Sequence, residues 1–457
     1  MADALDSVLA PGGWALASVA ATDGEEAGRF NTLFGRDSLI FALQVLPDRP
    51  DVAVATLRAL AKLQGSSDDP ETDEEPGKIL HEQWRHAPPR LIDMGWPVRD
   101  GGLLYYGSAD STSWFLVLLD ALGDDRLTAE LEPSWRAAGE WLERTLARGG
   151  GLVRHGPRRA PGGLAQQGWR DTTDPLDPDT RGGGILREDG SAPSPPLADA
   201  DSQAVAVAAA NALARLSGEP SHRQLAEALR ARVVGAFGAF GAFGAPPDPE
   251  RAAVAAATPD PLGLPVTSPA IAAKPACLPD TIAIEGDGRR VRGAGSQLGW
   301  LLWADAAAPG AAERLVQPDL LTPWGLRTLS DRHPQFAAGA YHRGAVWPFD
   351  CWLGWGGLRS AGRHDEAERV RAGVLDALNR LGGAPELYAV GPNGPEPIAI
   401  ANRVQAWTVG ARWAFEHDWD GRFISPSGSR GSPGRCQRPP RAPAPPARRA
   451  RARGPGR

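Results

Sequence analysis

The chain is poor in several residue types and patterns, and each scarcity excludes a class of protein. Its three cysteines, Cys277, Cys351 and Cys436, are scattered and form no CxxC pair. This argues against a disulfide framework or a zinc site and fits a reducing compartment. No run of about 18 apolar residues occurs, so no membrane helix is predicted. The N-terminus lacks the basic and apolar regions of a secretion signal. We therefore expect a cytoplasmic protein that does not bind membranes.

Acidic residues are missing from the C-terminal segment. Residues 425–457 contain nine arginines and no acid, whereas the whole chain has a net charge of −6, so residues 1–424 carry −15. An acidic body repels nucleic acid and leaves neutral polymers such as glucans as acceptable partners. The basic tail is rich in Pro, Arg and Gly and is predicted to be disordered. Either an inert solvated extension or a segment that binds a polyanion fits this composition.

The alternation that marks β-strands is almost absent, and helical patterns dominate. Apolar helices that follow polar loops alternate about five or six times with amphipathic helices that end at glycine. The apolar segments are within 31–46, 105–123, 202–216, 296–306 and 342–358, and the amphipathic ones include 52–63, 222–234 and 365–381. A ring of buried helices inside a ring of half-exposed helices produces this pattern. We predict an all-α (α/α)6 toroid over residues 1–424, with an irregular helical bundle or solenoid as the alternative.

The loops before the inner helices would gather at one end of such a toroid and line a pocket. The loop Gln166–Asp174, QQGWRDTTD, carries two carboxylates, Asp171 and Asp174, directly after Trp169 and Arg170. An indole can stack on the apolar face of a sugar while an acid reaches its oxygens. A surface turn with solvated acids is the alternative. The spaced acids of 174–184 do not have the glycine placement of an EF-hand loop, so neither a metal nor another cofactor is predicted.

Eight polar motifs occur in order between Asn31 and Phe415: FGRDSL, PGKILHE, YYGSADST, QGWRDTTD, WGLRTLS, YHRGAVWPFD, PELYAV and QAW. Together they resemble the amylo-α-1,6-glucosidase part of glycogen debranching proteins, among the six-hairpin glycosidases. The resemblance implies an inverting exo-α-glucosidase that removes α-1,6-linked glucose from a glycogen-like glucan or oligosaccharide. Its acid position matches Asp171, and its base position matches Glu386 in PEL. Inversion needs carboxylates about 6.5–9.5 Å apart.

A general acid must hold a proton near neutrality, so its pKa must be raised. Burial of Asp171 against Trp169 would raise its pKa, whereas Arg170 would lower it if the guanidinium pointed inward. We therefore expect Arg170 to turn toward substrate or toward another acid. Glu386 must stay ionised to take a proton from water. Asp174 is the alternative acid.

Further residues of the motifs are candidates for substrate binding, each with a structural alternative. Arg36 and Asp37 can bind sugar hydroxyls by charge-assisted hydrogen bonds. The alternative is that they form a structural ion pair and that Asp37 or Ser38 caps the helix. Asp110 is a ligand or an N-cap, and His81 with Glu82 binds sugar or supports a loop. Trp324, Trp347 and Trp407 are candidate stacking platforms for a sugar face, and the alternative for each is a place in the core. The full predicted set of substrate-binding residues is Arg36, Asp37, His81, Glu82, Asp110, Trp169, Arg170, Trp324, Arg327, Tyr341, His342, Trp347, Gln405 and Trp407.

The chain departs from the pattern of this family in four places, one of which is the segment IANRV before QAW, where the family shows a Cys-Pro pair. The family usually has a β-rich domain before this one, but FGRDS begins near residue 34, so we expect such a domain to be missing or on another chain. An acid-Val-Gln of the family is Asp201-Ser202-Gln203 here, and a histidine-bearing motif has Trp300. These changes bear on branch specificity more than on hydrolysis. The alternatives are a toroid glycosidase for another α-glucoside, a disaccharide or a compatible solute, and a non-catalytic glucan-binding protein.

Overall fold

A computed structural model describes residues 2–19, 30–159, 162–177, 182–238 and 278–422. These residues belong to one compact unit that ends at Arg422. The tail that we predict to be disordered, 425–457, lies outside the described residues.

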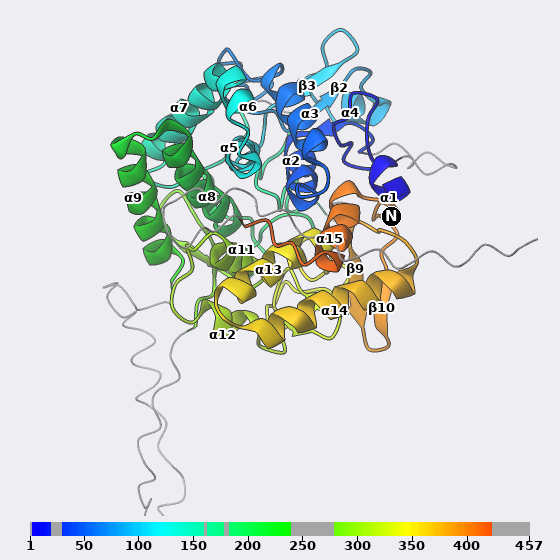
Figure 1. The fold of residues 1–457 in the computed structure, drawn as a ribbon. Helices are drawn as coiled ribbons and strands as arrows, with labels where there is room; N and C mark the ends of the chain where they lie inside the picture. The colour runs from blue at the N-terminus through cyan, green and yellow to red at the C-terminus, as the bar shows by residue number, and fades with distance from the viewer. Residues whose placement is uncertain (1, 20–29, 160–161, 178–181, 239–277, 423–457) are drawn as a thin grey trace, which may run out of the picture. The chain divides into compact units, whose positions relative to one another are not determined.

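Six buried helices form a closed inner ring within this unit (Figure 1). They are α2 (Gly35–Gln44), α5 (Ser111–Leu122), α8 (Ala200–Ser217), α11 (Gln297–Trp303), α13 (Pro348–Ser360) and α15 (Ala406–Glu416). Each helix packs against the next, and α15 packs against α2 to close the ring. All ten residues of α2 are buried, because this helix contacts other helices on every side. This explains why its sequence lacks a polar face.

Amphipathic helices cover the outside of the ring. They are α1 (Ala2–Asp6), α3 (Pro50–Ala61), α7 (Glu132–Arg148), α9 (Pro220–Ala236), α12 (Ala311–Leu315) and α14 (His364–Leu381), with the short α4 (Pro89–Asp93) and α6 (Asp125–Glu130) in connections. Each of the first six packs on an inner helix, and α1 covers α15, so the N-terminus completes the outer layer. The predicted (α/α)6 toroid is therefore confirmed, and the irregular bundle is excluded.

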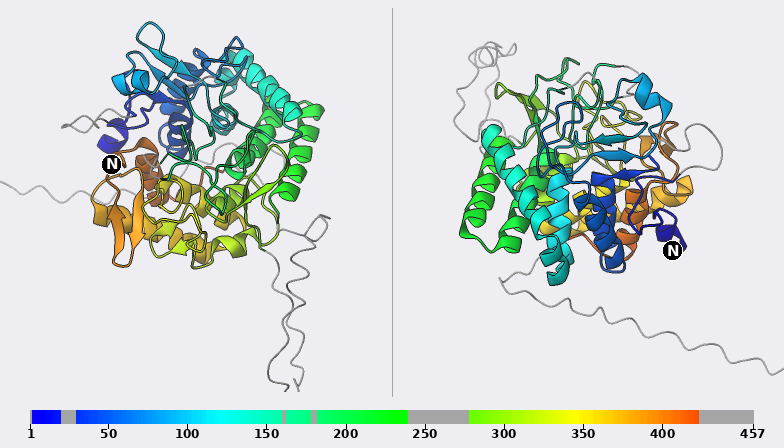
Figure 2. Two further views of the ribbon diagram at one scale, coloured as in Figure 1. Left: turned by 180° about the vertical axis from the view of Figure 1, so that it is seen from behind. Right: turned by 90° about the horizontal axis from the view of Figure 1, so that it is seen from above.

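In the part of the chain that the structure describes, four small antiparallel sheets lie between the helices. They are β1–β2–β3 (Leu33–Phe34, Glu82–Trp84, Leu103–Tyr105), β4–β5–β6 (Ala198–Asp199, Thr281–Ile284, Arg290–Arg292), β7–β8 (Leu321–Thr322, Gly325–Leu326) and β9–β10 (Tyr388–Gly391, Gly394–Pro397). Strands of two to four residues are too short for alternation to reveal them in the sequence. Because β1 leads into α2 and β4 into α8, strands and polar loops gather at the N-terminal ends of inner helices (Figure 2, right).

The start of α2 is set by close packing. A Cβ on Gly35 would lie 2.2 Å from the backbone oxygen of Leu80, so only glycine fits there. The prediction that Asp37 or Ser38 caps this helix is wrong, since its N-cap residue is Phe34 and no side chain caps it. Instead, Ser38 Oγ donates to the backbone oxygen of Ala15. Both polar side chains serve tertiary contacts rather than the helix end.

Candidate active site

Arg36, the second residue of α2, is a buried cation that joins two carboxylates. Its Nε donates to both oxygens of Asp110, at 2.9 and 2.8 Å, and its Nη1 donates to Asp171 Oδ2 at 2.9 Å. Asp110 stands at the N-cap position of α5, but its side chain makes no capping bond. It accepts from Arg36 and from Ser108 Oγ instead, which corrects the capping alternative. The ion pair thus fixes Arg36 between the neighbouring helices α2 and α5 and directs it toward Asp171.

Asp171 combines accessibility with a raised proton affinity. Its side chain is 26% exposed, so a ligand can reach it. Burial raises the pKa of its carboxyl to about 6, and the charge and hydrogen bond of Arg36 oppose that rise. Asp174 is exposed and its Oδ1 accepts from the backbone N–H of Leu176 at 2.9 Å. It therefore shapes the turn that follows, and the alternative in which Asp174 is the acid finds no support in this placement.

Glu386 is buried and held by several donors. The hydroxyl of Tyr341 donates to its Oε1, and the backbone and side-chain nitrogens of Asn402 both donate to its Oε2, at 3.1 Å each. Donors of this kind stabilise a carboxylate in its ionised form. Asn402 is absent from the predicted site residues, because the segment IANRV before QAW stands out in the sequence only as a departure from the family pattern.

A chain of contacts connects the surroundings of the two carboxylates. Gln405 Nε2 donates to Asp37 Oδ1 at 3.1 Å, and Gln405 Oε1 accepts from Asn402 Nδ2 at 3.0 Å. Burial raises the pKa of Asp37 to about 8, partly countered by the adjacent guanidinium of Arg36, and the negative charges of Asp171 and Glu386 add to the rise. Asp37 therefore lies within electrostatic range of both carboxylates. The structure brings Arg36, Asp37, Asp171, Glu386 and Gln405 into one site.

His81 and Glu82 border this site from the strand side. Burial raises the pKa of Glu82 to about 7. The hydrogen bond from the Trp84 indole opposes this rise, and the negative charge of Asp171 adds to it. The indole N–H of Trp84 donates to Glu82 Oε2. Burial and then Arg36 lower the pKa of His81 well below its usual value, so its ring is neutral. Its Nδ1 is buried without a hydrogen-bond partner among the described residues. Glu82 thus lies within electrostatic range of Asp171, and His81 lies within that of Arg36.

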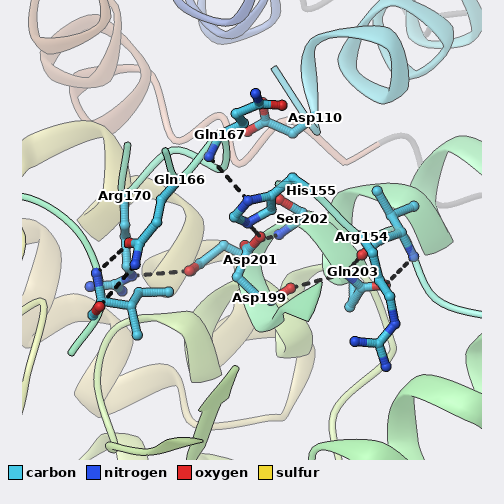
Figure 3. A network of polar contacts seen from close by, with 12 residues as sticks. Asp110, Arg154, His155, Gln166, Gln167, Arg170, Asp199, Asp201, Ser202 and Gln203 are labelled. Atoms are coloured by element: carbon cyan, nitrogen blue, oxygen red, sulfur yellow. Dashed lines mark hydrogen bonds and ion pairs between the residues drawn. The ribbon is translucent and has the colours of Figure 1, made fainter. Parts of the chain in front are cut away.

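Arg170 does not contact Asp171. Its Nε donates to Asp201 Oδ2 at 3.0 Å (Figure 3), and the side chain is 2% exposed. Its Nη1 donates to the backbone oxygens of Thr328 and His342, and its Nη2 donates to Ser296 Oγ. All three nitrogens are therefore occupied by the protein. Of the two expected directions, toward substrate or toward another acid, the structure shows the second, and the prediction of substrate binding by Arg170 is corrected.

Three tryptophans that are predicted to bind substrate, Trp169, Trp347 and Trp407, belong to an aromatic core. Trp169 lies parallel to Trp300, with centroids 5.8 Å apart, and Trp407 stacks on Phe349 at 4.0 Å. Trp347 is packed among the same rings. Trp169 and Trp347 are 1% exposed and Trp407 is 4% exposed. Their faces are covered by other side chains, so these rings support the loops rather than offer an open surface to a sugar.

Three other predicted residues are engaged elsewhere. Trp324 lies against the guanidinium of Arg380 on the outer helix α14, 4.4 Å from the ring centroid. Arg327 forms an ion pair with Asp331. His342 is buried, and burial lowers the pKa of its ring well below the usual value.

The described residues contain no group of three or more His, Cys, Asp or Glu side chains that could hold a metal ion. Within the same ranges, no helix has the length and apolar character needed to cross a membrane.

Comparisons with known proteins agree with the fold and find one segment that is similar to a glycoside hydrolase domain. Residues 276–389 match the family model of the mannosylglycerate hydrolase MGH1-like glycoside hydrolase domain, a segment that includes Glu386 but not Asp171. The chain is similar in structure to the GH63 mannosylglycerate hydrolase from Thermus thermophilus in complex with Tris and D-glycerate. The TM-score is 0.59 at 14% identity, over 91% of this chain and 98% of that chain. The complex of that enzyme with glucose gives 0.58 at 15% identity over the same shares.

No protein of curated function matches the sequence significantly. Residues 276–389 are similar to a glycoside hydrolase domain, and the solved structures support the toroid fold. They do not point specifically to debranching proteins.

Proposed function

We propose that this protein is an inverting exo-α-glucosidase that releases α-1,6-linked glucose from glycogen-like glucans. Asp171 is the general acid and Glu386 the general base. The observation that carries the proposal is the contrast between the two carboxyls. Asp171 is reachable and has a pKa raised to about 6, whereas Glu386 accepts from Tyr341 and twice from Asn402. An acid that keeps its proton and a base that loses it are what inverting hydrolysis requires.

The reaction follows from these two states. Asp171 gives its proton to the glycosidic oxygen as the bond from that oxygen to the anomeric carbon breaks. A water molecule on the opposite face of the sugar forms the new bond to the same carbon, and Glu386 takes a proton from that water. Each turnover leaves Asp171 ionised and Glu386 protonated, and exchange of one proton with solvent restores both groups.

Arg36 and Asp37 are placed to recognise the sugar. Arg36 Nη2 is a buried donor without a hydrogen-bond partner among the described residues, although the other nitrogens used by this guanidinium bind Asp110 and Asp171. Leaving such a donor unpaired costs roughly 1–3 kcal/mol, and a sugar hydroxyl would satisfy it. We therefore assign Arg36 and Asp37 to the binding of the terminal glucose.

The α-1,6 linkage is supported by the order of the eight motifs from FGRDSL to QAW. A second candidate is a glycoside whose leaving group is a small hydroxy acid, and the match of residues 276–389 favours it. His342, Arg343 and Ile185 line a small cavity. The first two of these residues directly follow Tyr341, whose hydroxyl donates to Glu386. Arg343 Nε is buried without a hydrogen-bond partner among the described residues, while its Nη1 donates to the backbone oxygen of Gly183 at 3.4 Å. Such a cation would suit a carboxylate on the leaving group.

A substrate panel separates these candidates. The full chain is incubated with isomaltose, a branched limit dextrin, maltose, trehalose and mannosylglycerate, and the released sugar is followed by NMR. Glucose from isomaltose and limit dextrin, appearing first as the β-anomer, supports the proposal. Release from mannosylglycerate alone supports the second candidate. Glucan binding without turnover of any substrate between pH 4 and 8 would refute both and indicate a binding protein.

Two variants test the assigned roles. Asp171→Asn and Glu386→Gln should each lower kcat by on the order of 10³-fold or more, because each removes one proton transfer, while glucan binding and thermal stability change little. Asp174→Asn is the matched control, since this exposed carboxylate lies on the same loop and should leave kcat unchanged. A rate near that of the wild type from either of the first two variants would remove the role assigned to that residue.

A further inference from the structure

The loop that carries Asp171 is anchored at Gln167, four residues before the acid. The backbone N–H of Gln167 donates to His155 Nδ1 at 3.2 Å, and its backbone oxygen accepts from the N–H of Ala109 at 2.8 Å. Its side-chain Nε2 donates to Asp73 Oδ2 at 3.0 Å. Three different segments therefore hold one residue, and one of these contacts is made by an ionisable ring.

The contact from Gln167 fixes the proton position on His155. A nitrogen that accepts a hydrogen bond carries no proton, so Nδ1 of His155 must be bare and the ring proton must lie on Nε2. His155 Nε2 is 3.1 Å from Asp199 Oδ2, where this proton is donated (Figure 3). Both side chains are 3% exposed, so water does not compete for either bond.

The surroundings of Asp199 keep its carboxylate available to accept the hydrogen bond from His155 Nε2. Burial alone would raise the pKa of Asp199, but His155 and the N–H of Ser202 hold it below the usual value, so the carboxyl is ionised. Its Oδ1 accepts from Ser202 N at 2.8 Å and caps α8, which leaves Oδ2 for His155. A Cβ on Gly168 would lie 2.9 Å from Asp199 Oδ2, so the acid loop approaches this carboxylate as closely as a glycine allows.

We propose that His155 is a positioning residue for the general acid. Asp199, fixed at the start of α8, sets the tautomer of His155. The unprotonated Nδ1 of His155 then holds the backbone of the Asp171 loop at Gln167. The inference rests on the proposed role of Asp171, because positioning has a catalytic meaning only if this loop carries the acid. The arrangement is comparable to an acid–histidine pair in which a carboxylate selects the tautomer, but here the histidine binds a backbone amide and not a reacting group.

The tautomer can be measured without any substrate. The full chain is labelled with ¹⁵N-histidine, and the ring nitrogens are recorded by NMR at pH 7, with His155→Asn used to assign the signals of this ring. We expect a neutral ring protonated at Nε2. A ring protonated at Nδ1, or at both nitrogens, would overturn the inference even if the enzyme were inactive on every glycoside.

A pair of variants separates the two ring nitrogens. In His155→Asn the amide oxygen stands near the place of Nδ1 and can still accept from Gln167, whereas in His155→Gln the amide lies near the place of Nε2 and reaches Asp199 only. We expect faster amide exchange of residues 164–173 in His155→Gln, measured by hydrogen–deuterium exchange, and little change in His155→Asn. Equal exchange of this segment in both variants and the wild type would overturn the proposal.

Kinetics on a substrate that the wild type turns over supply the second readout. Misplacement of a reacting group by about 1 Å can cost on the order of 10²-fold in rate, so kcat should fall about 10- to 100-fold in His155→Gln. KM should remain within about threefold, and His155→Asn should restore most of kcat. A purely structural role would lower stability in both variants and leave kcat per folded molecule unchanged. If His155→Gln does not fold, Asp199→Asn replaces it. The substitution removes the negative charge that faces His155 Nε2 or the oxygen that accepts from Ser202, so it disturbs the His155–Asp199 pair from the side of the carboxylate.

Discussion

The interaction between Asn402 and Glu386 gives the sharpest test of the base. Both nitrogens of Asn402 donate to Glu386 Oε2 at 3.1 Å, and the Asn402 side chain is half-buried. Asn402→Asp is nearly isosteric, but it replaces the side-chain donor by a carboxylate that faces Glu386 at the same distance. The backbone donor remains, so the change is mainly one of charge.

The magnitude follows from the distance. Two unit charges 3.1 Å apart interact by about 5 kcal/mol at an effective dielectric constant of 20. Because solvent reaches this half-buried position and screens the two charges, we halve the interaction energy to roughly 2–3 kcal/mol. Since about 1.4 kcal/mol corresponds to one pH unit, the acidic limb of the kcat/KM profile should move up by about 2 pH units. At a pH just above the midpoint of the wild-type limb, the variant should therefore retain only a few per cent of wild-type activity.

The assay is kcat/KM against pH from 3.5 to 9 on the best substrate of the panel. Asn402→Ala is the matched control, because it removes the side-chain donor without adding charge and should move the limb far less. Circular dichroism at each pH separates activity loss from unfolding. An acidic limb that stays within about 0.3 units of wild type in folded Asn402→Asp would refute Glu386 as the base that must ionise.

Two further predictions concern stability. Burial raises the pKa values of Asp37 to about 8, Glu82 to about 7 and Asp350 to about 6, so the folded state binds protons that the unfolded chain releases. The stability that these carboxyls contribute is present below about pH 4 and is lost as pH rises toward 8. The lowered pKa values of His81 and His342 act in the opposite direction, because their rings must charge on unfolding at pH 5. Scanning calorimetry should therefore give a Tm only roughly 2–4 °C higher at pH 5 than at pH 8; an equal or higher Tm at pH 8 would contradict the raised carboxyl values. Gly35→Ala places a Cβ 2.2 Å from the backbone oxygen of Leu80 and should lower the free energy of unfolding by roughly 3 kcal/mol or more, as measured by urea unfolding, whereas a variant as stable as the wild type would show that α2 can shift without cost.

Some features of the site could be predicted because they depend on neighbours in the sequence. The motifs FGRDS, GWRD and PEL stand directly before or between helices, and the toroid gathers such loops at one end. The sequence therefore indicates that Arg36, Asp171 and Glu386 belong to such loops, and the resemblance to debranching proteins implies the acid and base positions. Their catalytic roles remain proposals.

Other features depend on partners far along the chain. Gln405 contacts Asp37 across 368 positions, and no local pattern encodes that distance. The same reason explains the errors for Arg170 and the tryptophans. Whether a guanidinium faces a sugar or a buried carboxylate such as Asp201 depends on which helix lies opposite it.

The sequence alone therefore determined the ring of helices, because the burial of a helix on every side or on one side is recorded in its own apolar periodicity. It also determined which loops carry the polar chemistry, since each lies next to an inner helix. Only the tertiary structure decided which polar side chains meet, as in Asn402 with Glu386 and His155 with Gln167. Hydrogen bonds are directional and short-ranged, so their partners are set by the way distant segments pack and not by the composition of either segment.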